Sequence, residues 1–428
     1  MIGALILVAL IFFLVIGLPL AFGMALASVI GLFLLDGNLI IMAMQIFEGL
    51  KSFPLVAIPL FLLMANLMEV GGVTDSLVRF ATSLIGHVRG SLAIGNVTAS
   101  TLFSGISGSC MADTTAVGSM LIPAMVREGY PPAFAGAVTA AANIVGPIIP
   151  PSILMILYGF AAEQSIAELF LAGILPGLLL SLIFGLYAFW VSSKKGYGSM
   201  GHRFSLKAVA VATVRATPAL VIPVLIVFGV TGGVFTLTES AGAAALYALL
   251  YALFRGALQG GVDWRGIGRA FFRAGIDTGV VMILVGASDF LSWVLTRSEM
   301  PEAILSVLSG YSPMVTLLLI NIVLLIFGTF LEPAPALLLA SALFLPLVKS
   351  LGIDLVHFGI IMIVNLQLGV LTPPVASAAF ITSRIAGISF EKQVRALLPF
   401  VGLGVIALLI ITYVPAVSLW VPSLFAAP

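Results

Sequence analysis

The chain has 428 residues, of which 61% are hydrophobic and only 8% are charged. A soluble domain carries about 25% charged residues, and a globule of this size could not keep so much apolar surface away from water, so the composition excludes a soluble fold. The net charge of +1 gives no electrostatic footprint for nucleic acid. The single cysteine excludes an intramolecular disulfide and a multi-cysteine metal site.

Long apolar runs divide the chain into predicted transmembrane helices. The runs lack the alternation of barrel strands, so they favour an all-α polytopic membrane protein with room for on the order of ten spans of about 20 residues each. The first run is too long for one straight span and is expected to bend or break at Pro19; its apolar start favours a first helix over a signal peptide. The runs cover 2–35, 53–70, 91–126, 131–161, 168–192, 213–231, 237–255, 273–296, 313–348, 356–386 and 396–421.

Basic residues set the expected orientation. Residues 193–215 contain lysines and arginines but no acid, and residues 255–273 contain four arginines and one aspartate, so both segments are predicted to be cytoplasmic. Counting spans outward from these loops leaves runs 91–126 and 313–348 with both ends on one side. Each is therefore predicted to be a hairpin that enters the bilayer and returns, the first from the cytoplasm and the second from the periplasm.

The chain matches itself when it is shifted by 223 residues. The shared residues are glycines and prolines, which set backbone geometry, so what repeats is a shape. Five apolar runs separate the two hairpins, an odd number, so the repeats are inverted, as in many secondary transporters. The other interpretation is that these residues are simply common in membrane helices. The matches are Gly105 with Gly328, Pro123 with Pro346, Gly129 with Gly352, Gly136 with Gly359, Gly146 with Gly369, and Pro150-Pro151 with Pro373-Pro374.

The first repeat contains a hydroxyl-rich segment, residues 104–115, and a proline-rich segment, residues 143–152. Prolines lack an N–H donor and disfavour helix at the preceding residue, so the second segment must unwind. Unwound backbone at membrane depth occurs only inside protein or along a watery cavity. Freed carbonyls and hydroxyls suit a cation such as sodium, and helix N-termini suit an anion. The alternative is a kinked helix packed by small residues.

The second repeat, residues 328–335 and 365–374, has fewer hydroxyls but places Glu332 at the position that matches Ser109. An acid inside the membrane is a functional candidate, and Asp113 has the same status. Either could bind a cation, carry a proton or be a satisfied structural carboxylate. Asp277 and Asp289 lie away from the breaks and are predicted to form structural pairs.

Other chemistries have little support in the sequence. The pattern G-x-x-x-x-G-K-[ST] is absent, so ATP drive is not encoded in this chain. The histidines are too scattered for a transition-metal site, and none accompanies Ser107 on its span as a hydrolase would require. We therefore expect a protein that is not an enzyme.

Four segments together resemble the large membrane subunit of tripartite ATP-independent periplasmic (TRAP) transporters: SGISGSCMADTTAVGSMLIPAM, NIVGPIIPPS, GTFLEPAPALLL and NLQLGVLTPPV. The resemblance covers essentially the whole chain; one departure is Ala376, where many relatives would have glycine. It implies a sodium-driven importer of a small carboxylate in the bacterial inner membrane, with no cofactor besides sodium ions. It also implies two partners, a small four-helix membrane subunit and a soluble periplasmic substrate-binding protein.

The resemblance further implies a scaffold and a transport domain that moves like an elevator. The expected segments are scaffold helices in 1–90, the first hairpin and broken helix in 91–161, connecting helices in 168–312, the second hairpin and broken helix in 313–386, and a C-terminal helix in 387–428. One sodium site would use Ser104, Ser107, Gly108, Ser109, Asn143 and Gly146, and the other Thr329, Glu332, Pro333, Gly369 and Thr372. The substrate carboxylate would lie between the hairpin tips, at Ser109, Asp113, Pro150, Pro151, Pro373 and Pro374.

Several functions stay open at this point. A stand-alone transporter or exchanger would move free substrate without partner proteins. A passive channel can also use re-entrant hairpins and carbonyl-lined filters, but it could not concentrate solute. A membrane enzyme is opposed only by the lack of an acid–base constellation. Coupling to protons instead of sodium would point to Glu332 or Asp113 as the proton carrier.

Overall fold

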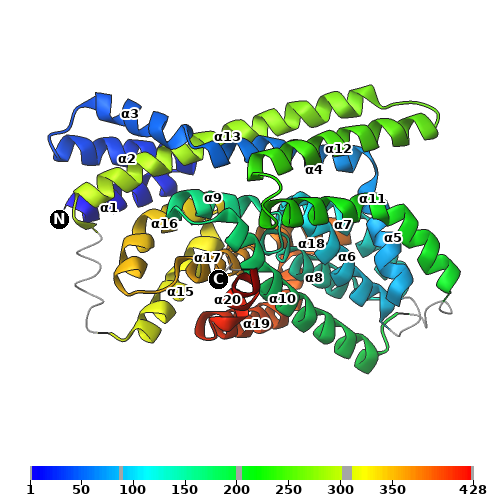
Figure 1. Cartoon of the computed structure of the whole chain (residues 1–428). Helices are drawn as coiled ribbons and strands as arrows, with labels where there is room; N and C mark the ends of the chain where they lie inside the picture. The colour runs from blue at the N-terminus through cyan, green and yellow to red at the C-terminus, as the bar shows by residue number, and fades with distance from the viewer. Residues whose placement is uncertain (1, 86–89, 199–204, 301–310, 426–428) are drawn as a thin grey trace.

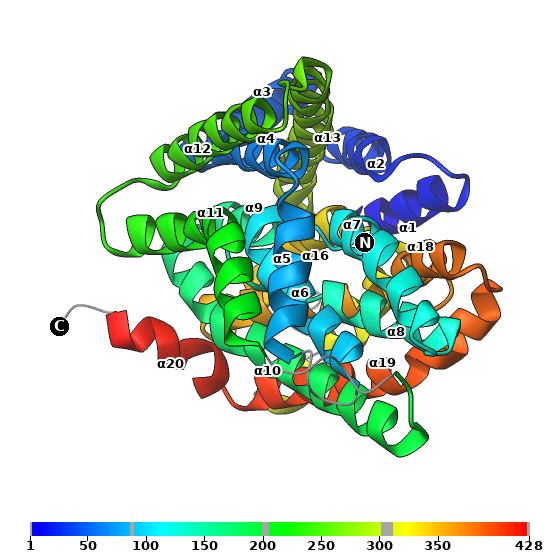
Figure 2. The ribbon, with the colours of Figure 1, turned by 90° about the vertical axis from the view of Figure 1, so that its right-hand side faces the viewer.

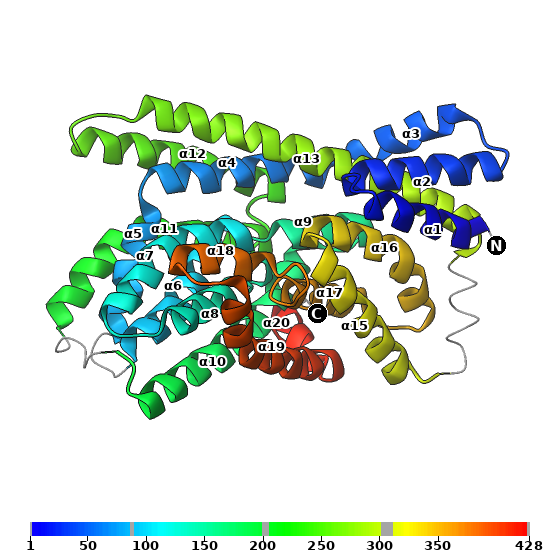
Figure 3. The same cartoon turned by 180° about the vertical axis from the view of Figure 1, so that it is seen from behind.

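The helices form two layers, which lie one above the other in Figure 1. The computed structural model describes residues 2–85, 90–198, 205–300 and 311–425. In the upper layer α13 packs against α2, α3 and α4, and α12 packs against α4. Figure 3 shows α1 and α2 at the end of this layer, above the second hairpin. The upper layer comprises α1 (Ile2–Val15), α2 (Leu20–Leu34), α3 (Leu39–Leu50), the short 3-10 turn η1 (Phe53–Val56), α4 (Ala57–Val70), α12 (Leu237–Leu258) and α13 (Trp264–Arg297).

The lower layer holds both hairpins and both broken helices. The first hairpin is α6 (Ser91–Ser107) and α7 (Cys110–Arg127), and the second is α15 (Pro313–Phe330) and α16 (Pro333–Ser350). Figure 2 shows α5 and α11 at one edge of this layer, beneath α12. The other elements are α5 (Val73–Ile85), α8 (Pro132–Asn143), η2 (Gly146–Ile148), α9 (Ile153–Ala162), α10 (Ile166–Lys195), α11 (Leu206–Thr231), α17 (Leu355–Gly369), α18 (Ser377–Ala386), α19 (Phe390–Tyr413) and α20 (Ala416–Phe425).

The lengths of the helices agree with a polytopic membrane protein. Within the described ranges, seven helices are long and apolar enough to cross a membrane, or up to nine if each bent pair is one span. One such pair is Pro132–Ile148 with Ile153–Ala162, bent by 41°. The predicted break at Pro19 is also present, because α1 ends at Val15 and α2 begins directly after Pro19, whose fixed φ suits a helix start. The all-α fold class is confirmed.

The internal repeat extends to the helices themselves. The helix α7 begins and ends at residues that, shifted by 223, are the first and last residues of α16. The remaining helices of hairpins and broken segments correspond within a few residues, and the Pro150–Pro151 and Pro373–Pro374 bonds are both cis. The repeats are interlocked, since α9 packs against α16 and α18 packs against α7. Each broken helix therefore supports the hairpin of the other repeat.

Two matched glycines lie where helices approach each other closely. A Cβ on Gly136 of α8 would lie 3.0 Å from the side-chain Cδ of Gln393 on α19. A Cβ on Gly359 of α17 would lie 2.9 Å from Cζ of the Tyr158 ring on α9. The Tyr158 hydroxyl donates to the Leu355 carbonyl at 2.6 Å. The matching spacing of these glycines therefore reflects a close approach between helices.

Two helices were not predicted from the apolar runs. The helix α3 falls in the gap between runs 2–35 and 53–70, because Gln45 and Glu48 interrupt its apolar pattern. The helix α5 carries Asp75 and Arg79 on one face, where they form an ion pair at 2.8 Å. A criterion that looks for uniformly apolar runs overlooks such amphipathic helices.

The predicted loops 193–215 and 255–273 are too wide. The helix α10 continues to Lys195, and α11 already begins after Ser205, whose hydroxyl caps it; residues 199–204 lie outside the described ranges. The helix α13 begins after Asp263, which also caps its helix. The basic residues were assigned to loops because they are charged, although lysine and arginine are good helix formers. The predicted single C-terminal helix is instead two, α19 and α20, which are separated at Val414 and Pro415.

Candidate functional site

The first hairpin turns at its tip within two residues. The helix α6 ends at Ser107, Gly108 takes a left-handed conformation with φ 60°, and Ser109 caps the N-terminus of α7. The Gly108 N–H donates to the Ser104 carbonyl at 3.2 Å. A Cβ on Gly108 would lie 3.0 Å from the Pro151 carbonyl oxygen. Glycine therefore supplies both the backbone angle and the space with which the tip touches the first broken helix.

The first broken helix unwinds after Asn143, in a segment that contains three prolines. Residues Gly146–Ile148 form a single 3-10 turn, and α9 starts only after Ser152. The Ser152 hydroxyl donates to the Pro147 carbonyl at 2.5 Å, so it satisfies one of the carbonyls that the helix leaves free. Pro150-Pro151 is buried, which encloses the irregular backbone in protein as its membrane depth requires.

Oxygen atoms from the hairpin and the break converge around Asp113. The Asp113 side chain is fully buried, and its Oδ1 accepts a hydrogen bond from the Ser107 hydroxyl. A Cβ on Gly146 would lie 2.8 Å from Asp113 Oδ2 and 3.5 Å from Ser104 Oγ. Asp113 Oδ2 is one of several buried side-chain atoms that have no hydrogen-bond partner among the described residues, and Asn143 Oδ1 at the end of α8 is another. A carboxylate and hydroxyls are ligand types that hard cations take, so the oxygens of Asp113, Ser104 and Ser107 form a candidate cation site.

The second hairpin packs against α17 through two glycines. A Cβ on Gly328 would lie 2.8 Å from a carbonyl oxygen of α17, and Gly369 faces the Gly328 backbone directly. The hydroxyls of Thr329 and Thr372 donate to carbonyls of their own segments at 2.8 and 2.9 Å. Pro373-Pro374 is exposed. The second break is therefore open on one side, whereas the first is covered by protein.

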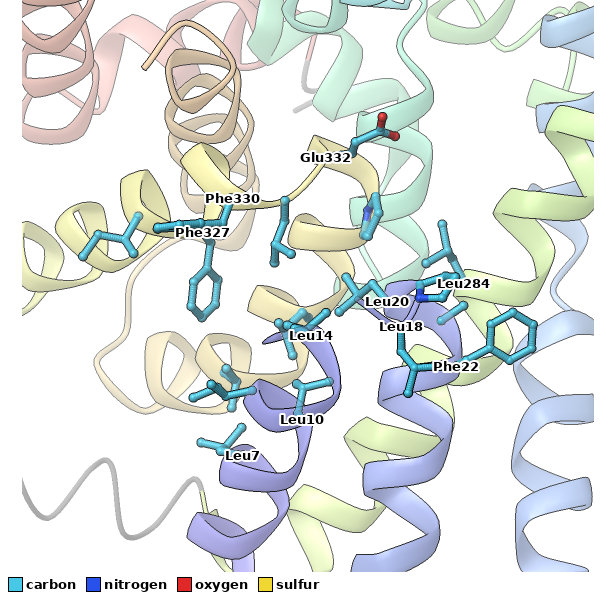
Figure 4. A pocket seen from close by; sticks show the side chains of 18 of the residues that line it. Leu7, Leu10, Leu14, Leu18, Leu20, Phe22, Leu284, Phe327, Phe330 and Glu332 are labelled. Carbon is cyan, nitrogen blue, oxygen red and sulfur yellow. The ribbon is translucent and has the colours of Figure 1, made fainter. Parts of the chain in front are cut away.

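Glu332 lies at the tip of the second hairpin, where it occupies the N-cap position of α16 without capping it through its side chain. It is exposed and lines a crevice of about 1330 Å³ between the α1–α2 turn, α13 and the second hairpin. The other lining residues are apolar or glycine. In Figure 4 the Glu332 carboxylate points away from the leucine side chains of α1.

The residues predicted to bind sodium are only partly brought together. In the first set, Ser104, Ser107 and Gly146 surround Asp113, while Gly108 and Ser109 form the hairpin tip and Asn143 ends α8. In the second set, Thr329 and Gly369 lie where the hairpin meets α17, Thr372 lies at the open break, and Glu332 and Pro333 lie at the hairpin tip beside the crevice. Their roles in binding sodium stay predictions.

The residues predicted to bind substrate lie in different environments. Asp113 lies beside residues of the first predicted sodium site, and Ser109 is half-buried at the tip of the first hairpin. Pro150 and Pro151 are buried, whereas Pro373 and Pro374 are exposed. The second break is therefore more exposed than the first. The described residues include no cluster of three or more His, Cys, Asp or Glu side chains suited to a metal ion.

Three buried asparagines were missed as candidates. Asn365 of α17 donates to both the carbonyl oxygen and Oδ1 of Asn321 on α15, each at 2.9 Å. In the first repeat Asn96 of α6 donates to the Thr139 hydroxyl of α8 at 2.7 Å. Each hairpin is thus tied to its own broken helix by a buried amide. The available signal was an asparagine inside an apolar run, since polar residues at membrane depth pair between helices.

The expected structural pairing of Asp277 and Asp289 is not observed. Neither carboxylate belongs to the ion pairs formed by the described residues. Asp277 is exposed on a face of α13 where the adjacent Gly275 and Gly279 meet no other atoms. Asp289 packs against Gly49 of α3. The face of α13 that carries Asp277 is not covered by any of the described residues.

Two hairpins in inverted repeats, each packed on a broken helix, define a membrane transport protein. The chain belongs to the family described as "Tripartite ATP-independent periplasmic transporter, DctM component", whose model matches residues 7–417. It is therefore a multi-pass component of a transporter and not an enzyme.

The relatives cover most of the chain. The "C4-dicarboxylate TRAP transporter large permease protein DctM" of Pseudomonas aeruginosa is 40% identical over 384 residues, 89% of this chain and 89% of the relative. The "Isethionate TRAP transporter permease protein DctMQ" of Oleidesulfovibrio alaskensis is 36% identical over 412 residues, 95% of this chain but 64% of the relative. The crystal structure of the YdaH transporter of Alcanivorax borkumensis is similar in fold, with a TM-score of 0.64, 15% identity, and coverage of 92% of this chain and 90% of that one.

Proposed function

We propose that this chain imports a small organic acid across the bacterial inner membrane and couples the import to sodium. The observation that carries the proposal is the oxygen cluster at Asp113, where a buried carboxylate has one oxygen without a partner. An uncompensated charge inside a membrane protein is costly. A bound sodium ion would remove that cost. If the substrate binds beside the ion, the binding of sodium and the binding of substrate become coupled.

The proposed substrate class follows from the relatives and from the helix ends at the site. C4-dicarboxylate and isethionate, named for two relatives, are small organic anions. The N-termini of α7 and α16 lie at the two hairpin tips, and helix N-termini attract anions. A carboxylate between these tips would meet partial positive charge without needing an arginine.

The proposed partners are a small four-helix membrane subunit and a soluble periplasmic binding protein. This chain spans only 64% of the Oleidesulfovibrio permease, which leaves room in that longer relative for an additional segment. The family description names a tripartite, periplasmic system. We propose that the binding protein hands over the substrate and that the two hairpins and two broken helices then move together against the remaining helices as an elevator.

The test is uptake into vesicles that contain this chain, its candidate small subunit and its binding protein. Labelled carboxylates are supplied with and without an inward sodium gradient. We expect accumulation only with the sodium gradient and the binding protein. The variants Ser107→Ala and Gly146→Val are expected to lose it, because the first removes an oxygen ligand and the second fills the space beside Asp113.

The possible outcomes separate the alternatives. Uptake driven by a proton gradient and indifferent to sodium would overturn the proposed ion and make Asp113 or Glu332 the proton carrier. Movement of free substrate by the chain alone would contradict the tripartite assembly. Equilibration without accumulation would identify a channel.

A further inference from the structure

A basic pocket lies on the edge of the molecule, away from both broken helices. It is formed by α5 and α11 of the lower layer and by α12 above them (Figures 1 and 2); α11 packs against both other helices, and a cavity of about 980 Å³ lies among the three. Four basic side chains line the pocket against a single acid, Asp75, which already pairs with Arg79 at 2.8 Å. The basic residues are Arg79, Lys207, Arg215 and Arg255.

Arg255 is held in place by hydroxyl groups. Its Nη1 donates to the Ser76 hydroxyl at 3.3 Å and to the Tyr251 hydroxyl at 3.0 Å, and the residue is half-buried. It belongs to none of the ion pairs among the described residues, and neither does Lys207 or Arg215. A guanidinium fixed in this way is ready to bind an anion, because little rotamer freedom remains to be lost. The Ser205 hydroxyl at the start of α11 also lines the pocket, whereas the hydroxyls of Ser76 and Ser83 on α5 already donate to backbone carbonyls.

Apolar side chains flank the charges on the outer faces of α11 and α12. Val214 is 73% exposed, Phe254 64% and Leu258 72%, and all three line the same pocket. A small soluble anion would leave this apolar surface exposed, whereas the acyl chains of a lipid would cover it. Basic pockets between transmembrane helices bind the phosphate headgroups of anionic lipids.

We propose that this pocket binds an anionic phospholipid. Its phosphate lies between Arg215 and Arg255, within reach of Lys207, and its acyl chains lie along Val214, Phe254 and Leu258. The site joins α12 of the upper layer to α5, the helix that leads into the first hairpin. The general preference of basic residues for the cytoplasmic side explains why basic residues occur in this region. It does not explain why basic residues from three helices converge on one cavity with apolar flanks.

The test measures lipid binding to the purified full chain by native mass spectrometry and by the shift in Tm. The probes are phosphatidylglycerol, phosphatidylcholine, glycerol 3-phosphate and inorganic phosphate. We expect phosphatidylglycerol to be retained and to raise the Tm, while the other three have little effect. The variant Lys207→Gln/Arg215→Gln/Arg255→Gln should weaken phosphatidylglycerol binding at least about tenfold, which corresponds to about 1.4 kcal/mol.

The matched control is Arg265→Gln/Arg269→Gln/Arg273→Gln on α13, which removes the same charge from helix α13. It should leave phosphatidylglycerol binding within about twofold. Equal losses in both variants would mean that only net charge matters and would overturn the proposal. So would competition by inorganic phosphate as strong as that by the lipid, which would indicate a site for a free anion. If the triple variant does not fold, Arg215→Gln alone, at an exposed position of α11, gives the same comparison against Arg269→Gln.

Discussion

Asp113 is the residue on which the proposed coupling depends most. It is fully buried, it accepts from Ser107, and one of its oxygens faces the gap that Gly146 leaves open. A carboxylate in this position needs a cation or a proton, because burying an unpaired charge costs several kcal/mol. Gly146 acts here by the absence of a side chain.

Replacing Asp113 by asparagine keeps the shape of the side chain and removes its charge. We expect Asp113→Asn to raise the sodium concentration for half-maximal uptake at least about tenfold, since one charged ligand is lost and tenfold corresponds to about 1.4 kcal/mol. The sodium dependence of initial uptake rates measures this shift. The matched control, Asp277→Asn at an exposed site on α13, should leave the dependence unchanged. An unchanged sodium dependence in a folded Asp113→Asn protein would remove Asp113 from the cation site.

At the scale of helices, each hairpin is fixed to a broken helix by small residues and one buried amide. In the second repeat the backbones of Gly328 and Gly369 touch, and Asn365 holds Asn321. Side chains at the two glycines would force the hairpin away from α17. The rigidity of the unit therefore depends on residues that carry no chemistry of their own.

Adding a methyl group at this contact tests its importance. We expect Gly369→Ala to destabilise the protein by about 1–3 kcal/mol, as overpacking does, and to lower both Tm and uptake. Thermal unfolding in detergent measures the Tm. Gly402→Ala on α19, where a Cβ would meet no atom within 4 Å, should be neutral or slightly stabilising. A Gly369→Ala protein with unchanged Tm would show that the hairpin can shift at no cost.

The sequence predicts the parts of this architecture that local residues determine. The breaks follow from Pro150 and Pro373, and the hairpin tip follows from Gly108, because proline and glycine act on their own backbone. The contact between Asn321 and Asn365 could not be predicted, since it joins residues 44 positions apart. The position of Glu332 beside an apolar crevice is likewise set by the packing of α1, α2 and α13 around the hairpin.

At the scale of the whole molecule, the two repeats have different surroundings. By their order in the chain, α1 and α2 at the start of the first repeat correspond to α11 and α12 at the start of the second. The helix α11 touches the first hairpin, where a Cβ on Gly105 would lie 3.0 Å from Pro223 Cγ. The crevice of about 1330 Å³ instead separates the α1–α2 turn from the second hairpin. The first hairpin is therefore packed against its neighbouring helix, whereas the matching second hairpin lies beside an open crevice.

A disulfide between the first hairpin and α11 should stop an elevator movement. In a Cys110→Ser background, Gly105→Cys with Pro223→Cys would join atoms whose Cβ positions are 3.3 Å apart, close to the span of about 3.5–4.5 Å that a disulfide needs. We expect oxidation to abolish uptake and dithiothreitol to restore it. The control pair, Ile46→Cys with Gly286→Cys, has a Cβ separation of 3.7 Å within the upper layer and should transport whether oxidised or reduced. Full transport by the oxidised Gly105–Pro223 pair would contradict the movement.

The crevice beside the second hairpin has a thermodynamic consequence. In a second arrangement, the first hairpin could lie beside a crevice and the second hairpin could pack against a neighbouring helix. The contacts would be of much the same kinds, but different residues would make them. Two arrangements related in this way differ in free energy only through the differences between the two halves of the sequence. A ligand can shift such a balance only by its differential affinity for the two states. In the proposed elevator, a modest preference of sodium or substrate for one state would therefore change which side of the membrane the site faces.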